Sequence, residues 1–120
     1  MSGSLVALCA DTTSLQHPES IGLAGENLAA QDWLRIFSSA EEARRFLRTD
    51  RLVDEVWVAS SDDVAPINLA ATLKRDRSDR CVCMLSFEDT GSLKSRMSAT
   101  GIDASLTRQA LAERYARRKQ

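Results

Sequence analysis

The chain has 120 residues, of which 28% are charged, and its formal net charge is −1. This length predicts a single domain over residues 1–120 with one hydrophobic core, and the small net charge argues against direct binding of nucleic acid or of an anionic membrane. The N-terminus lacks a basic region followed by a long apolar run, and no segment is apolar over the length of a bilayer span. We therefore expect a cytoplasmic protein without membrane insertion.

The three cysteines, Cys9, Cys81 and Cys83, lie in apolar runs that are typical of buried strands. We expect reduced cysteines that act as small hydrophobic side chains, not a disulfide framework. Cys81 and Cys83 share one face of a strand, which leaves a metal site as an alternative. Because the single histidine, His17, is distant in sequence and no second cysteine pair exists, we predict no metal and no cofactor.

Apolar runs alternate with helical segments in the first half of the chain. Residues 5–9 form the first predicted strand, a helix is expected to begin near Pro18, and residues 33–37 form the second strand. Ser39 begins a capping box, which predicts a helix that continues to about Arg48.

The second half of the chain continues this alternation. Strands are predicted at residues 56–59 and 81–85 and in a short run that ends at Leu106. Each is followed by a helix with its own capping candidates, which are Asp62 or Asp63, Asp89 or Thr90, and Thr107. The repeated strand–helix units, with continuously apolar central strands, predict an α/β fold: a doubly wound parallel sheet of five strands with helices on both faces.

Residues 101–108 resemble the last signature of the receiver domain of two-component response regulators, the CheY-like family. That signature is a Gly-Ala-Asp-Asp-Tyr-Leu-Thr-Lys-Pro run, and the matching positions here are Gly101, Asp103, Leu106 and Thr107, with Arg108 in place of the lysine. Ser86, after the fourth predicted strand, matches the family's Thr or Ser. The resemblance covers essentially the whole chain and implies the flavodoxin-like strand order 2-1-3-4-5.

Most residues that receivers use for phosphorylation are replaced in this sequence. The resemblance places Ala10 and Asp11 at the acidic pair that holds magnesium, and Ala59 or Ser60 at the phosphate-accepting aspartate. An acyl phosphate needs a carboxylate nucleophile and a cation held by further carboxylates. Ser105 also replaces the aromatic switch residue of the family. We therefore predict a pseudo-receiver that is not an enzyme, with the degenerate site Asp11, Ala59, Ser60, Ser86 and Arg108.

Three alternatives remain open at the sequence level. If the third strand ends later than its apolar run, Asp62 or Asp63 becomes the phosphate acceptor instead of a helix cap. Asp11 either holds a ligand or only caps the loop after the first strand. Cys9, followed by a hydroxyl-rich loop, resembles the phosphocysteine loop of phosphotransferase-system IIB domains, although that loop has no glycine.

The resemblance implies a regulatory, localisation or protein-interaction role in bacterial signalling or pilus assembly. Degenerate receivers occur as N-terminal parts of longer regulators, and the chain is similar to the atypical receiver of the CpaE or TadZ pilus-assembly ATPases. These 120 residues contain no P-loop, so the ATPase domain would follow them. A downstream DNA-binding domain fits the same residues.

Receivers commonly associate through the face formed by their fourth helix, fifth strand and fifth helix. We therefore expect a homodimer or a partner protein on this face, while inward packing of Leu111 with solvated charges is the alternative. The candidate residues of this interaction face are Leu93, Met97, Leu111, Arg114, Tyr115 and Arg117.

Overall fold

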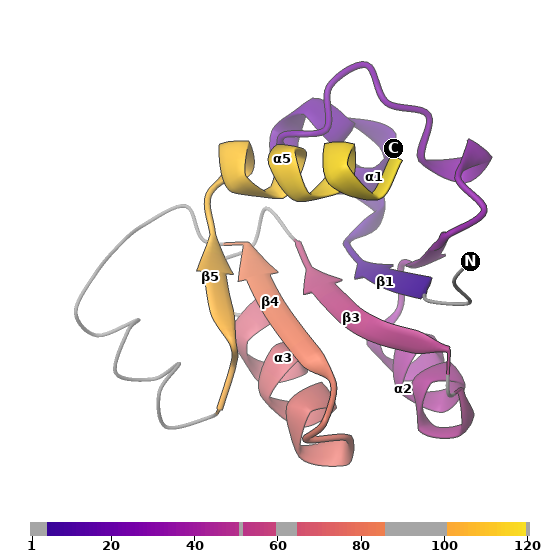
Figure 1. The fold of residues 1–120 in the computed structure, drawn as a ribbon, viewed down its shortest axis with the longest axis vertical. Coiled ribbons are helices and arrows are strands. Elements are labelled where there is room, and N and C mark those ends of the chain that lie inside the picture. Colours follow the sequence, from indigo (N-terminus) through magenta and orange to yellow (C-terminus); the bar gives the residue numbers. More distant parts are fainter. Residues whose placement is uncertain (1–4, 51, 60–64, 86–100, 120) are drawn as a thin grey trace.

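The fold is that of a computed structural model, which describes residues 5–50, 52–59, 65–85 and 101–119. Figure 1 shows a sheet whose neighbouring strands follow the order β2-β1-β3-β4-β5, and every pair is parallel. The strands are β1 (Leu5–Cys9), β2 (Leu34–Phe37), β3 (Val53–Val58), β4 (Cys81–Leu85) and β5 (Ala104–Leu106). The helices in these ranges are α1 (Thr12–Gln16), α2 (Ala40–Thr49), α3 (Ala65–Asp76) and α5 (Arg108–Lys119), with short 3-10 helices η1 (Pro18–Ile21) and η2 (Leu28–Ala30).

Two apolar cores lie on opposite faces of the sheet. The α5-side core contains Leu111 and Tyr115 of α5 together with Trp57 of β3. The α2/α3-side core contains Leu47 of α2 and, from β3, Val56. Figure 1 shows α1 and α5 on one side of the sheet and α2 and α3 on the other. The doubly wound sheet and the strand order expected from the sequence are confirmed.

Short-range sequence signals correctly predicted two helix starts. The Ser39 hydroxyl accepts a hydrogen bond from the Glu42 N–H at 3.4 Å and caps α2. The Thr107 hydroxyl accepts from the Ala110 N–H at 3.1 Å at the start of α5. Each side chain satisfies a backbone donor that has no partner within the helix.

The first helix was predicted at the wrong place, because it begins at Thr12 and not near Pro18. Asp11 caps it by accepting from the Ser14 N–H. Pro18 instead begins η1, where its fixed φ and missing N–H are tolerated. The helix has only five residues with a single large apolar side chain, Leu15, and therefore leaves no periodic pattern in the sequence.

Strand β3 begins earlier than predicted, at Val53, and contains a bulge. Leu5 of β1 pairs with Val53 and the next residue, Val6, pairs with Glu55, so Asp54 is the extra residue on β3. The polar side chains of Asp54 and Glu55 interrupt the apolar run on which the prediction relied. The capping candidates Asp62, Asp63, Asp89 and Thr90 lie outside the described residues, and so does the start of the helix predicted after the fourth strand.

Candidate functional site at the carboxyl edge of the sheet

The carboxyl ends of β1 and β3 lie side by side and hold two small apolar residues. The Ala59 N–H donates to the Cys9 carbonyl oxygen at 2.9 Å, so the pairing of the two strands continues past the last residue of β3. Ala59 is 1% exposed and Ala10 is 6% exposed. A methyl group without any oxygen therefore stands at the first of the two positions that the receiver resemblance assigns to the phosphate acceptor.

Asp11 follows these residues and closes the first turn of α1. Its carboxylate accepts from the Ser14 N–H at 3.2 Å and from the Ser14 hydroxyl. Ser14 is fully buried, so these hydrogen bonds replace the water that its polar atoms lose on folding. Of the two roles that the sequence left open for Asp11, the structure shows the capping role.

Arg108 is the first residue of α5 and is exposed. Its backbone lies against Gly22, which follows η1: a Cβ on Gly22 would be 2.9 Å from the Arg108 carbonyl carbon and closer still to its oxygen. The chain between β1 and β2 therefore reaches the start of α5, which follows β5 at the same edge of the sheet as Asp11 and Ala59.

Four other site candidates lie outside the described residues: Ser60, Asp62, Asp63 and Ser86. The structure neither brings them to Ala59 and Asp11 nor separates them. Ser105, at the position of the family's aromatic switch residue, is exposed in β5.

Cys9 does not have the properties of a nucleophilic cysteine. Its side chain belongs to the α2/α3-side core and is 4% exposed. Burial raises the pKa of its thiol to about 12. Phosphocysteine chemistry needs an accessible thiolate near neutral pH, so this environment argues against the IIB-like alternative.

The interaction face predicted on α5 requires a correction. Leu111 is 1% exposed and Tyr115 is fully buried, so both belong to the α5-side core and are not exposed for a partner. The helical spacing of the two residues marks the inward face of α5, and the alternative expectation that Leu111 packs inward is confirmed. Arg117 is exposed, and Leu93 and Met97 lie outside the described residues.

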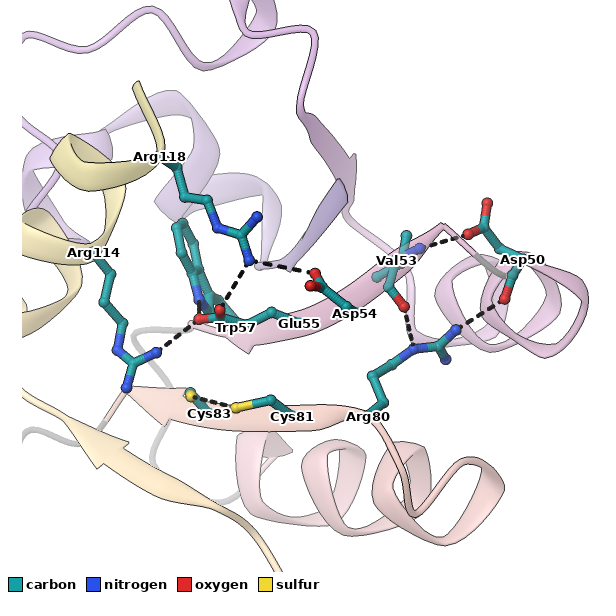
Figure 2. Close-up of polar contacts among 10 residues, drawn as sticks. All are labelled: Asp50, Val53, Asp54, Glu55, Trp57, Arg80, Cys81, Cys83, Arg114 and Arg118. Carbon is teal, nitrogen blue, oxygen red and sulfur yellow. Dashed lines mark hydrogen bonds and ion pairs between the residues drawn. The ribbon is translucent and has the colours of Figure 1, made fainter. Parts of the chain in front are cut away.

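A carboxylate on β3 binds the polar side of α5, which no short-range sequence signal indicated. Glu55 accepts from Arg114 at 2.8 Å and from Arg118 at 3.2 Å, and it also accepts from the Trp57 indole N–H (Figure 2). Arg118 lies 3.3 Å from Asp54 as well. We call these five residues the Glu55 clamp. The Glu55 side chain is only 13% exposed, and its donors come from α5 and from β3 itself.

The described ranges, with their gaps, contain no group of three His, Cys, Asp or Glu side chains placed to hold a metal ion. In the same residues, no helix combines the length and the apolar character that crossing a membrane requires.

No family model and no curated protein matches the chain. Its architecture is that of a doubly wound α/β domain of the flavodoxin type, in which a parallel sheet of order 2-1-3-4-5 carries helices on both faces. Comparison with solved structures defines the fold more closely: the chain has the fold of the CheY-like receiver domain of response regulators.

Three of these structures illustrate the similarity. The chemotaxis protein CheY4 of Vibrio cholerae matches with a TM-score of 0.66 and 16% identity, over 95% of this chain and 98% of that chain. An orphan response regulator of H. pylori matches with a TM-score of 0.64 and 20% identity, over 100% of both chains. A putative pilus assembly-related protein from Burkholderia pseudomallei matches with a TM-score of 0.64 and 14% identity, over 98% of this chain and 90% of that chain.

Proposed function

We propose that this domain is a pseudo-receiver: a non-enzymatic module for regulation and protein interaction that has the receiver fold and does not accept a phosphoryl group. The observation that carries the proposal is the buried methyl group of Ala59, which directly follows β3 and pairs with β1. An acyl phosphate forms only on a carboxylate nucleophile.

The surrounding residues support the same proposal. Ala10 contributes no oxygen to a divalent cation, and the Asp11 carboxylate caps α1. Arg108 keeps a positive charge at the start of α5, but a planar guanidinium does not replace a lysine ammonium at a compact phosphoryl site. Of the described residues that the receiver resemblance assigns to this site, only Asp11 carries a carboxylate, and one carboxylate is too few to hold a metal ion against a phosphoryl group.

Acetyl phosphate with magnesium tests the proposal directly. We expect the intact mass of the protein to stay unchanged, and beryllofluoride with magnesium to leave the fluorescence of Trp33 and Trp57 unchanged. An unrelated intact receiver, treated in parallel, shows that the reagents are active. A mass increase of one phosphoryl group that hydroxylamine removes would contradict the pseudo-receiver.

Substitutions of Asp62 and Asp63 complete this experiment. If phosphorylation is seen, single Asp62→Asn and Asp63→Asn variants identify the acceptor, since these residues follow β3 along the chain. Loss of the mass increase in one variant would establish the phosphorylatable alternative.

We also propose that the domain is the N-terminal part of a longer cytoplasmic protein. The similarity to a putative pilus assembly-related protein favours a following ATPase domain of the pilus-assembly type, and the similarity to a LuxR family DNA-binding response regulator from Silicibacter pomeroyi leaves a DNA-binding output as the second candidate. The coding sequence after Gln120 tests both, because a P-loop or a DNA-binding helix pair would select one of them.

A further inference from the structure

Two thiols lie next to each other on the face of β4 that α5 covers. The sulfur atoms of Cys81 and Cys83 are 3.8 Å apart, and both residues are free cysteines (Figure 2). Strand geometry places the two side chains on one face, because residues two apart in a strand point the same way. The contact between the sulfur atoms shows that the two thiols also point toward each other. The pair is therefore placed to react together.

The two thiols differ in exposure. Cys83 is fully buried in the α5-side core, whereas Cys81 is partly exposed and packs against the edge of this core. A small oxidant from solution therefore reaches Cys81 first. Burial raises the pKa of the Cys83 thiol to about 12, and the neighbouring Cys81 adds to the rise. Cys83 is thus protonated near neutral pH and can donate its S–H to the Cys81 sulfur, which is left to act as the nucleophile.

We propose that Cys81 and Cys83 form a site of reversible oxidation by hydrogen peroxide. The Cys81 sulfur attacks one peroxide oxygen, the O–O bond breaks, and a sulfenic acid and one water molecule result. The Cys83 sulfur then attacks the Cys81 sulfur, the S–O bond breaks, and a second water molecule leaves. The two thiols lose two electrons to the peroxide, and their protons end in the two water molecules. The reduced cysteines that the sequence predicts are then one of two states.

Backbone geometry allows this bridge and makes it easy to reduce. Cα atoms two residues apart in a strand are about 6.6 Å apart, and disulfides span about 4.4–6.8 Å between Cα atoms. A disulfide between Cys81 and Cys83 therefore lies near the upper limit of the range and requires β4 to shorten slightly. Strained disulfides are reduced more readily than structural ones, so a dithiol reductant should restore the two thiols.

Arg114 supports the second step. Its charge acts against burial and lowers the pKa of Cys83. Figure 2 shows Arg114 extending from α5 toward β4, where it donates to Glu55 at 2.8 Å. Once Cys81 is a neutral sulfenic acid, its charge no longer raises the pKa of Cys83, whereas Arg114 still lowers this pKa. Cys83 therefore becomes a better nucleophile after Cys81 has reacted, which sets the order of the two steps.

Treatment of the full reduced chain with hydrogen peroxide, followed by alkylation of the unfolded chain with N-ethylmaleimide, tests the site. The reduced chain should take up three adducts, one for each cysteine, and the oxidised chain only one. Trypsin cleaves after Arg80 and Lys94, so Cys81 and Cys83 lie in one peptide, which should lose two hydrogen atoms and regain them with dithiothreitol. Tryptophan fluorescence should fall on oxidation and recover on reduction, because disulfides quench indole and Trp57 pairs with Cys83 in the sheet register.

Three variants separate the roles of the thiols. Cys81→Ser should form no bridge and keep Cys83 as a free thiol, because the oxidant does not reach Cys83. Cys83→Ala, which keeps the core apolar, should leave Cys81 as a sulfenic acid that dimedone traps. Cys9→Ala is the matched control, because it removes the thiol from the opposite core and should form the bridge like the wild type. Circular dichroism of every variant checks folding, and Cys81→Ser decides the matter if Cys83→Ala does not fold.

Three results would overturn the proposal. The first is a peroxide-treated wild type that still takes up three adducts. The second is a disulfide that joins two chains or includes Cys9. The third is loss of the Cys83 thiol in Cys81→Ser at the rate of the wild type. The oxidation does not depend on phosphorylation, so its failure would leave the pseudo-receiver proposal intact.

Discussion

Gly22 and Arg108 are in backbone contact although they lie far apart in the sequence. Gly22 has a positive φ of 87° and presents its missing side chain to the Arg108 carbonyl group. The contact joins the irregular chain between β1 and β2 to the first residue of α5. It therefore fixes the position of α5 next to the carboxyl edge of the sheet, where the candidate functional site lies.

Gly22→Ala should lower the free energy of unfolding by about 2–4 kcal/mol. Part of this loss is the cost of an L-residue at positive φ, and the rest is steric overlap with the Arg108 backbone, which cannot rotate away. Gly25→Ala is the control, since Gly25 also has a positive φ, 77°, but has nothing within 4 Å of the added Cβ. Urea denaturation should show about 1 kcal/mol for Gly25→Ala. Equal losses for the two variants would contradict the role of the contact.

Arg80 holds three backbone segments together from a buried position. Its guanidinium donates to the carbonyl oxygens of Val53 at 2.8 Å, Leu47 at 3.2 Å and Asp50 at 3.0 Å. The residue is only 3% exposed. These bonds satisfy carbonyl groups at the end of α2, in the turn after it and at the start of β3, which would otherwise be buried without donors.

Arg80→Met should therefore lower the free energy of unfolding by about 2–4 kcal/mol, even though the methionine fills similar space. Arg75→Met is the control, because Arg75 is exposed in the last turn of α3. We expect a change within about 0.5 kcal/mol for this control. Thermal and urea unfolding of both variants measure the difference, and a wild-type stability of Arg80→Met would show that the three carbonyl groups find water instead.

The sequence predicted those parts of the fold that depend on neighbouring residues. Apolar runs located β1 and β4, and the hydroxyl groups of Ser39 and Thr107 located two helix starts. Contacts between residues that are distant in sequence cannot be predicted from these local patterns. The residues next to Arg80 in the sequence do not indicate that its side chain binds the turn after α2. Hydrogen-bond and ion-pair partners on neighbouring strands depend on the register of the sheet, which local sequence patterns do not show.

At the candidate site, too, local features could be predicted from the sequence and long-range contacts could not. The position of Ala59 directly after β3 could be inferred from the end of an apolar run, because that run ends where β3 does within one residue. The packing of α5 could not be inferred in this way. Leu111 and Tyr115 have the spacing of any amphipathic helix face, and this spacing does not show whether the face contacts the sheet or a partner. Only the structure shows that Glu55, displaced in register by the bulge at Asp54, faces α5 and binds Arg114.

Glu55→Gln should weaken the attachment of α5 to the sheet. The amide can still accept from the Trp57 indole, but it loses the charge that binds Arg114 and Arg118 in a largely buried setting. We expect a loss of about 1–2 kcal/mol in the free energy of unfolding, together with a change in tryptophan fluorescence. Asp54→Asn is the control: the Asp54 side chain is 59% exposed, and its loss should cost at most about 0.5 kcal/mol. Equal effects of the two variants would show that Glu55 behaves as a surface charge.

Asp103 should contribute to the pH dependence of stability. Burial alone would raise its pKa, but the bonds from the Lys74 ammonium, at 2.8 Å, and from the Val82 N–H, at 2.8 Å, lower the pKa below its usual value. A carboxyl group whose pKa is lower in the folded state stabilises the fold above its unfolded pKa of about 4, and this contribution is lost as the pH falls through the folded pKa.

Asp103→Asn should therefore lower stability at pH 7 and reduce the fall in stability below about pH 4. The exposed Asp32→Asn variant controls for the change in net charge. Urea denaturation of the three proteins between pH 2 and pH 7 measures the effect, at pH steps of about one unit. Parallel stability curves for Asp103→Asn and wild type would contradict the contribution of this carboxylate.

Self-association through α5 can be tested with two arginines that the structure distinguishes. Arg117 is exposed, whereas Arg114 donates to Glu55 within the same chain. If the domain forms a homodimer through the predicted interaction face, Arg117→Glu should shift sedimentation toward the monomer without a change in melting temperature. Arg114→Glu should instead lower the melting temperature, because it places a second carboxylate beside Glu55. A wild-type domain that remains monomeric at all concentrations would reject self-association and leave a different protein as the partner of this face.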